Sequence, residues 1–339
     1  MRVLVTGAAG FICGYLVEEL LAHGHDVVGL DNYSKYGYVA KSYDSHDRYR
    51  FVKGDAKDVS ILTDLAADCD QVVAAAAVVG GTGSFDALAY DLLAENERIT
   101  ASTFDAAIAA HRMGRLSRII VISSSMVFEA ASQFPTPEGA QLTSPPPIST
   151  YGLQKLSTEY FAKGAWMQHG LPFTILRPSN CVGTGDRRAL IESAVHSGNV
   201  KLGLSHVVPD LVRKVLAGQD PLHILGEGNQ VRHYTYGGDL ARGIRLAMES
   251  DAAVNEDFNL STAQGTTVLE LAELIWGRIN GDRPFNVVHD PAFPHDVRLQ
   301  MPDVTKATRI LGFEATTALD QVLDEVIPWI EAEMQTGRV

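Results

Sequence analysis

Cysteines are few in this sequence, and long apolar runs are absent. Cys13, Cys69 and Cys181 are widely spaced and form no CxxC pair, so neither a disulfide framework nor a thiolate zinc site is predicted. No apolar run reaches the roughly 18 residues that span a bilayer, and the opening MRVLVTG does not resemble a leader peptide. We therefore expect a cytoplasmic protein with no metal centre and no membrane anchor.

Positive charge is also scarce. The 339 residues include 28 Lys and Arg against 41 Asp and Glu, which gives a formal net charge of −13. Nucleic acids and anionic membranes attract basic surfaces, so neither is an expected partner. With 46% hydrophobic and 20% charged residues, the chain has an ordinary globular composition and is long enough for one large domain or two moderate ones.

Short β-branched runs alternate with amphipathic segments in the first half of the chain. The runs lack polar alternation, which is typical of strands buried on both faces. Their order predicts an α/β fold, a Rossmann-type doubly wound parallel sheet with helices on both faces. The predicted strands are 3–5, 26–30, 49–52, 71–74, 118–122 and 172–176, and the predicted helices lie near 11–23, 58–67, 85–112 and 150–169.

The pattern of predicted elements changes after about residue 180. Turn-rich stretches separate shorter helical patterns, which predicts a smaller C-terminal α/β lobe. The predicted helices of this second half lie near 208–217, 239–249, 267–279, 303–311 and 319–335.

The stretch TGAAGFICG, residues 6–14, joins the first strand to the first helix. A glycine-rich turn before a helix directs backbone N–H groups toward a pyrophosphate, although a tight turn without a ligand has the same pattern. Cys13 stands where such loops usually have their last glycine, which packs the helix on the sheet. We expect Cys13 to be buried and unreactive, with Gly14 keeping the neighbouring position slim.

Asp31 ends the second predicted strand. A carboxylate there can accept hydrogen bonds from an adenosine ribose and repel a 2′-phosphate. No arginine follows it, because the next residues are Asn32, Tyr33, Ser34 and Lys35. The cofactor indicated is therefore NAD rather than NADP, although a solvated aspartate in a turn would fit the same pattern.

Tyr151 and Lys155 lie four residues apart, on one face of a predicted helix. Beside a nicotinamide, the lysine cation would lower the pKa of the phenol, so that Tyr151 could act as a base toward a substrate hydroxyl. An ordinary surface pair of Tyr and Lys has the same spacing, so the other motifs of the chain must decide between the two interpretations. The run Ser123, Ser124, Ser125 ends the fifth strand, where a hydroxyl could hold the same substrate oxygen.

In order and spacing, these motifs resemble the extended short-chain dehydrogenase/reductases. Within that superfamily the sequence is similar to the NAD-dependent nucleotide-sugar epimerases and dehydratases of the UDP-glucose 4-epimerase type. The resemblance spans essentially the whole chain. Its further elements are Gly54-Asp55, the strand end at 74–77, Arg177-Pro178-Ser179-Asn180, 226–232, Asp239-Leu240, 296–298 and 303–306.

The resemblance implies a role for each matching residue. The implied catalytic residues are Ser124, Tyr151 and Lys155. The implied cofactor contacts are Gly7, Ala9, Gly10, Phe11, Ile12, Asp31, Asn32, Asp55, Ala56, Ala74, Ala75, Ala76, Asn96, Tyr151, Lys155 and Pro178. The implied substrate contacts are Ser124, Ser125, Met126, Asn180, His206, Val207, Arg232 and Arg298, and the two arginines would hold a nucleotide diphosphate.

The resemblance also implies a domain division and an assembly. We expect an NAD-binding Rossmann domain at 1–180, with a returning segment near 234–262. A nucleotide-sugar-binding lobe would comprise 181–233 and 263–339. The long helices near 85–112 and 150–169 would form the interface of a homodimer.

Departures from the family pattern narrow the reaction. Dehydratases carry an Asp-Glu pair just after the catalytic hydroxyl, but Ser125-Met126 stands there, so dehydration is disfavoured. The segment 205–209 is similar to the segment that carries an acidic histidine in the epimerase-reductases of fucose nucleotides. In those enzymes a cysteine works with the histidine, but Met126 stands at its position here. His206 is therefore a second acid/base, a substrate contact or a plain loop histidine. His233 and the pair Gly237-Gly238 also depart from the pattern, and neither distinguishes between substrates.

The function expected from the sequence is epimerisation of a nucleotide-diphosphate sugar. The reaction would pass through a transient keto-sugar with return of the hydride from NAD, most simply at C4. The alternatives are an NAD(P)-dependent keto-sugar reductase or 3/5-epimerase, and a non-catalytic NAD-binding regulatory protein.

Overall fold

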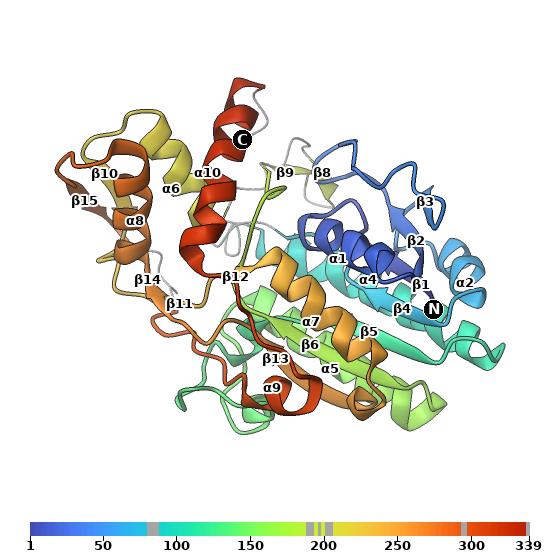
Figure 1. The fold of residues 1–339 in the computed structure, drawn as a ribbon. Helices are drawn as coiled ribbons and strands as arrows, with labels where there is room; N and C mark the ends of the chain where they lie inside the picture. Colours follow the sequence, from blue (N-terminus) through green and yellow to red (C-terminus); the bar gives the residue numbers. More distant parts are fainter. Residues whose placement is uncertain (80–87, 188–192, 196–197, 201–205, 293–296, 337–339) are drawn as a thin grey trace.

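The computed structural model of the chain describes residues 1–79, 88–187, 193–195, 198–200, 206–292 and 297–336. A parallel sheet with helices on both faces forms the larger part of the molecule. A smaller group of helices and short strands stands beside it (Figure 1). The fold class predicted from the sequence is confirmed.

The strand order of the central sheet reverses between β1 and β4, so that β1 has β2 on one side and β4 on the other. In the described part of the chain the sheet has seven parallel strands, in the order β13-β6-β5-β4-β1-β2-β3. Six lie within two residues of a predicted strand, and β13 joins the sheet from the returning segment. The strands are β1 (Arg2–Thr6), β2 (Asp26–Asp31), β3 (Tyr49–Lys53), β4 (Gln71–Ala74), β5 (Arg118–Ile122), β6 (Phe173–Pro178) and β13 (Glu256–Leu260).

Two layers of helices cover the sheet (Figure 1). The helices α1 (Phe11–Ala22), α7 (Gly237–Glu249) and α9 (Thr305–Leu311) share one apolar core with the sheet. The helices α2 (Val59–Ala67), α4 (Ala89–Arg112) and α5 (Thr150–His169) share the other. The helix predicted near 85–112 is observed from Ala89, and positions 85–87 lie outside the described residues.

Local sequence signals fix the ends of α5, the helix that carries Tyr151. The hydroxyl of Ser149 accepts a hydrogen bond of 3.0 Å from the N–H of Gly152, which caps the N-terminus. At the other end, Gly170 adopts a φ of 70°, which a residue with a side chain rarely adopts. The N-terminal cap places Tyr151 in the first turn of the helix.

The smaller lobe has its own apolar core. It is built on α6 (Val207–Leu216), α8 (Val268–Asn280) and α10 (Leu319–Gln335). Paired short strands complete it and connect it to the sheet: β7 (Cys181–Val182) with β12 (Thr235–Tyr236), β8 (Ser193–Val195) with β9 (Gly198–Val200), β10 (Leu222–Leu225) with β15 (Val287–Asp290), and β11 (Val231–Arg232) with β14 (Thr266–Thr267).

Helix α9 departs from the predicted division into domains. The sequence assigned 263–339 to the smaller lobe, yet Ala307 and Phe313 are buried in the core that α1 and α7 share with the sheet. Their apolar surface is removed from water only there, because α9 packs against β13.

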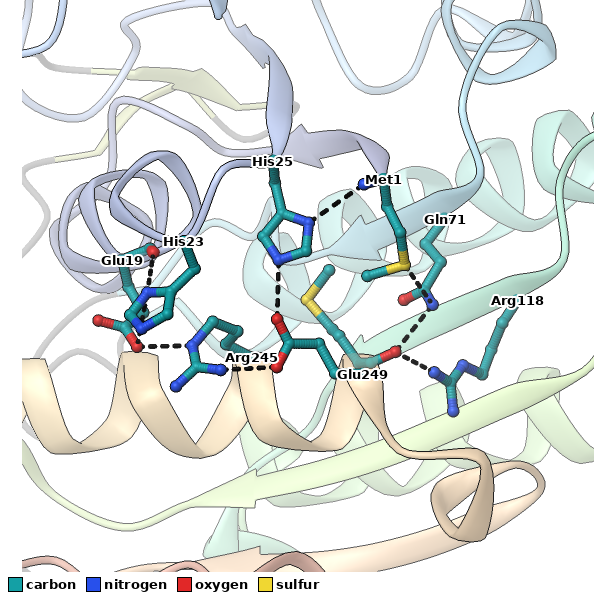
Figure 2. A network of polar contacts seen from close by, with 9 residues as sticks. Met1, Glu19, His23, His25, Gln71, Arg118, Arg245 and Glu249 are labelled. Atoms are coloured by element: carbon teal, nitrogen blue, oxygen red, sulfur yellow. Dashed lines mark hydrogen bonds and ion pairs between the residues drawn. The ribbon is translucent and has the colours of Figure 1, made fainter.

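Polar contacts fasten the C-terminal end of α7 beneath the sheet, at the edge where β1, β4 and β5 begin (Figure 2). The guanidinium of Arg118 donates to the backbone carbonyls of Met248 and Ser250, and the side-chain amide of Gln71 donates to that of Met248 at 2.9 Å. Nearby, Nε2 of His25 lies 2.9 Å from a carboxylate oxygen of Glu249. The hydrogen bonds from Arg118 and Gln71 satisfy backbone carbonyls at the helix terminus that have no partner within the helix.

Tyr15 connects α1 to the smaller lobe. Its hydroxyl accepts a hydrogen bond of 2.7 Å from the N–H of Thr184, and its ring meets that of Tyr236 edge to face at 5.5 Å. A Cβ atom at Gly237 would lie only 2.5 Å from the Tyr15 ring. Glycine at position 237, which the sequence left unexplained, therefore provides the space in which this ring packs.

Candidate active site

A cavity of about 660 Å³ opens at the carboxyl ends of the central strands, next to the smaller lobe. Open α/β sheets bind their ligands at this edge, near the point where the strand order reverses. Most of the predicted site residues line the cavity: Gly7, Ala9, Gly10, Phe11, Ile12, Asp31, Asn32, Asp55, Ala56, Ala75, Ala76, Ser124, Ser125, Met126, Tyr151, Lys155, Pro178, Asn180, His206, Val207 and Arg232.

The loop after β1 leaves a cradle at the start of α1. Gly7 has a φ of 75°, and a Cβ atom on it would lie 2.9 Å from Cα of Ala76, so only glycine fits. No side chain caps the N-terminus of α1, and its first turn carries no acidic residue. Free N–H groups and the positive end of the helix dipole therefore suit a phosphate at this place.

Cys13 lies in the first turn of α1 and is only 4% exposed. Burial raises the pKa of its thiol to about 12, so the thiol is protonated near neutral pH. The expectation that Cys13 is buried is confirmed.

Asp31 lies at the end of β2, with its carboxylate oriented by the backbone. One oxygen accepts a hydrogen bond of 3.1 Å from the N–H of Ala9, and the other accepts one of 2.7 Å from the N–H of Tyr33. Burial raises the pKa of this carboxyl group, and the two hydrogen bonds oppose the shift. The group is held at the cavity wall, where a ribose hydroxyl could donate to it.

Two predicted cofactor contacts lie behind the cavity wall instead. Asn96 exchanges hydrogen bonds with the backbone of Val78, at 2.7 and 2.9 Å, and so fixes the segment after β4. Ala74 and Asn96 line a separate small cavity of about 20 Å³ rather than the large one. Strand pairing holds Ala74 and the bonds to Val78 hold Asn96, so direct contact of these two residues with the cofactor stays a prediction.

The three predicted catalytic side chains meet at the ends of β5 and α5. Ser124 and Tyr151 are hydrogen-bonded through their side chains. Nζ of Lys155 donates a bond of 3.0 Å to the carbonyl of Ile122 and lies 6.0 Å from the centre of the Tyr151 ring. A hydroxyl, a phenol and an ammonium group are thus grouped at one point of the cavity.

The electrostatics of Tyr151 differ from the expectation. Burial raises the pKa of the phenol, and the hydrogen bond with Ser124 lowers it. Burial also lowers the pKa of Lys155, to about 8. The hydrogen bond with Ser124 therefore favours the phenolate here.

Gln300, which the sequence did not single out, joins two predicted substrate contacts. Its side-chain amide donates to the hydroxyl of Ser125 at 2.8 Å and accepts from the side chain of Asn180 at 2.8 Å. Asn180 itself has a φ of 33°, which is uncommon outside glycine. An uncharged glutamine far along the chain carries no sequence signal for this role, so only the fold shows it.

Asp186 and His206 form a second polar pair in the cavity. Nδ1 of His206 lies 2.9 Å from a carboxylate oxygen of Asp186, which is 3% exposed. Burial raises the pKa of Asp186, but His206 and the nearby Lys35 outweigh it and hold the pKa below its usual value. The sequence did not single out Asp186.

The two predicted arginines differ in position. Arg232 lines the cavity, but Arg298 is exposed and does not. Its backbone carbonyl accepts a hydrogen bond of 3.0 Å from Val231, so the segment is fixed against β11. Contact between Arg298 and a diphosphate stays a prediction, and positions 205 and 296 of the predicted motifs lie outside the described residues.

No group of three or more His, Cys, Asp or Glu side chains that could hold a metal ion occurs in the described part of the chain. In that same part, no helix is long and apolar enough to cross a membrane.

Comparison with known proteins places the chain. The model of the NAD dependent epimerase/dehydratase family matches residues 3–261, which is well over half of the chain. The chain belongs to this family. NAD is its cofactor, and the cradle at Gly7, which any side chain would fill, fits that cofactor.

Named relatives agree with this assignment. A rice protein (Oryza sativa subsp. japonica) described as "Putative GDP-L-fucose synthase 2" is 31% identical over 254 residues, covering 73% of this chain and 68% of its own. A UDP-glucose 4-epimerase from Mycolicibacterium smegmatis is 28% identical, covering 99% of this chain and 100% of its own.

A solved structure shows the same likeness along the whole chain. The UDP-glucose 4-epimerase of Thermotoga maritima, crystallised with UDP-glucose, superposes with a TM-score of 0.80 at 29% identity. The match covers 98% of this chain and 100% of that one. The chain is thus similar to nucleotide-sugar epimerases over its full length.

Proposed function

We propose that this protein is an epimerase of a UDP-linked sugar and that it inverts C4. The observation that carries the proposal is the hydrogen-bonded pair of Ser124 and Tyr151, placed in one cavity with the glycine cradle and Asp31. Similarity to UDP-glucose 4-epimerases over the full chain supports the choice of substrate and carbon. The pair Ser125-Met126, where dehydratases carry two acids, argues against loss of water.

The cofactor would lie along the glycine loop and Asp31. Gly7, Gly10 and the start of α1 would hold its pyrophosphate, and Asp31 with Asn32 would hold its adenosine ribose. NAD, when bound, supplies the reversible two-electron oxidation of the sugar carbon.

Tyr151 would be the base. As phenolate it takes the proton of the sugar hydroxyl, so that the carbon–oxygen single bond becomes a ketone. It returns the same proton when the hydroxyl is restored with the opposite configuration. Ser124 would hold the reacting oxygen and, through its bond to the phenol, favour the phenolate. Lys155, fixed to the carbonyl of Ile122, would keep a positive charge beside the developing negative charge.

The remaining cavity residues would bind the substrate without taking its proton. Arg232 would pair with the diphosphate, since a guanidinium can contact two phosphate oxygens at once. Ser125, Asn180 and Gln300, already linked to one another, would face the sugar.

We also propose a homodimer. Large apolar side chains are exposed on the two long helices α4 and α5, and a second copy of the same face would cover them. They are Tyr90, Leu153, Tyr160, Trp166 and Met167. Light scattering at micromolar concentration should give twice the chain mass of 36.7 kDa, and a mass of one chain would contradict the dimer.

A second candidate function rests on the pair of Asp186 and His206. A histidine held by a carboxylate is arranged to transfer a proton, as a 3/5-epimerase or keto-sugar reductase requires. The similarity to the rice protein agrees with this alternative. Met126 stands against it, because it offers no second acid.

One experiment separates the candidates. The purified protein is incubated in heavy water with UDP-, GDP-, ADP-, CDP- and dTDP-sugars, and the products are followed by NMR. C4 inversion without deuterium in the sugar is expected for a UDP-sugar. Deuterium next to a ketone, lost in His206→Asn, would favour the second candidate. Consumption of reduced cofactor in proportion to product would identify a reductase.

A further inference from the structure

The end of β5 and the helix α5 are joined at three successive points. Ile122, Ser123 and Ser124 follow one another in the chain, and Tyr151, Lys155 and Glu159 occupy successive turns of one helix face in that order. Lys155 bonds the carbonyl of Ile122, and Tyr151 bonds the hydroxyl of Ser124. Ser123, the residue between Ile122 and Ser124, donates a hydrogen bond of 2.7 Å from its hydroxyl to Glu159, which lies one turn beyond Lys155 on α5.

Glu159 touches none of the residues proposed to react, yet it is among the most constrained side chains of the molecule. It is 1% exposed, and its Oε1 accepts from both Ser123 and Nε of Arg177, each at 2.7 Å. Its Oε2 accepts from Nη2 of the same arginine, also at 2.7 Å. This two-point pairing fixes the plane of the carboxylate as well as its position.

Arg177 is in turn held from the other side. Its Nη1 lies 2.7 Å from a carboxylate oxygen of Asp257 on β13, and its guanidinium lies 5.0 Å above the ring of Phe128. Asp257 also receives a hydrogen bond of 2.9 Å from Lys306. The chain of contacts therefore joins β13, β6, α5 and the end of β5 below the cavity.

A buried ion pair of this kind adds little net stability, because removing two charges from water costs about as much as their attraction returns. Apolar residues of similar volume often replace such a pair in proteins with no loss of folding free energy. A hydrogen bond is directional, whereas apolar packing is not. The carboxylate of Glu159 accepts the Ser123 hydroxyl from one side only, which also fixes the backbone of the next residue, Ser124.

We propose that Glu159 is a positioning residue, which through Ser123 holds the turn at 123–125 so that Ser124 meets Tyr151. The proposal rests on the proposed epimerase function only for its kinetic consequence. Without this hold, the hydroxyl of Ser124 would move away from the phenol, while the cavity residues that bind NAD and nucleotide would stay in place.

The test removes the hydroxyl of Ser123, since Glu159→Gln would bring an amide N–H against Arg177 and could prevent folding. Ser123→Ala should lower kcat for the UDP-sugar about tenfold, with KM and NAD content changed less than about twofold. Ser123→Thr should restore the rate, because it returns a hydroxyl. Ser117→Ala is a control outside the cavity: its exposed hydroxyl donates to the carbonyl of Asp70 at 2.8 Å, just before β5 begins.

Each alanine variant loses one hydrogen bond, but only Ser123→Ala should lose turnover. A wild-type kcat in Ser123→Ala would overturn the proposal. Equal losses in the two alanine variants, or no recovery in Ser123→Thr, would also overturn it.

A second measurement does not depend on the reaction. Tyrosinate absorbance is titrated against pH, and the titration of Tyr151 is obtained by subtracting the curve of Tyr151→Phe. The midpoint should rise in Ser123→Ala, because the Ser124 hydrogen bond lowers the pKa of the phenol. If the wild type converts no nucleotide sugar, the proposed function fails, and this midpoint decides the positioning role by itself; an unchanged midpoint would overturn it.

Discussion

Nζ of Lys155 donates a hydrogen bond of 3.0 Å to the backbone carbonyl of Ile122, in surroundings that leave the lysine only 8% exposed. Burial lowers its pKa to about 8. A lysine in the unfolded chain has a pKa of about 10.4, so the folded protein binds this proton less tightly than the unfolded chain does. The buried charge therefore lowers the free energy of unfolding by its full amount below about pH 8, and this loss disappears as the pH rises toward about 10.

Lys155→Met should therefore stabilise the protein at pH 7, by roughly 1–2 kcal/mol, because it removes a buried charge and keeps most of the side-chain volume. The gain should shrink toward pH 10, where the wild-type lysine is neutral. Urea unfolding at pH 7 and at pH 10 measures this gain in stability, and Lys163→Met on the same helix is the control. A loss of stability that is equal at both pH values would contradict the proposed penalty.

Gly237→Ala should destabilise the protein, because its Cβ atom would lie 2.5 Å from the Tyr15 ring, which is fixed by Thr184 and Tyr236. Overpacking of this kind costs roughly 1–3 kcal/mol. Gly277→Ala is the matched control within α8, where nothing lies within 4 Å of the new Cβ atom. That variant should gain roughly 0.5–1 kcal/mol from helix propensity. Thermal unfolding that ranks the two variants in the opposite order would exclude this packing argument.

Cys13→Gly should keep NAD binding, because the cradle is formed by the backbone around Gly7 and Gly10. The thiol is 4% exposed and burial raises its pKa to about 12, so a thiol reagent should modify it slowly in the NAD-bound protein. Mass spectrometry after timed labelling follows this residue separately from Cys69 and Cys181. Rapid labelling of Cys13, or loss of NAD from the glycine variant, would show that the residue has a functional role.

Much of the fold was predictable because buried parallel strands have a distinct pattern. Strands β4 and β5 and helices α5 and α10 begin and end at the predicted residues. The contribution of α9 to the main core was missed, since an apolar helix pattern does not indicate which core it packs against. Only the folded chain shows which surface covers them.

The site was predictable where chemistry and strand ends coincide, as at Asp31, Ser124 and Tyr151. It was not predictable where the fold joins distant segments. Gln300 reaches Ser125 and Asn180 from the C-terminal part of the chain, and no property of a single glutamine indicates this. The role of Arg298 stays a prediction: its motif matches, and the residue lies exposed outside the cavity wall.

The proposed reaction depends on one proton acceptor, so the most direct test replaces it. Tyr151→Phe removes only the phenolic hydroxyl, and the NAD cradle and Arg232 remain. Turnover of the UDP-sugar is measured by NMR, and bound NAD and the Kd for the nucleotide sugar are measured on the same preparation. The account predicts that kcat falls by about a thousandfold or more while both binding measurements are unchanged. Turnover in Tyr151→Phe comparable with the wild type would contradict it.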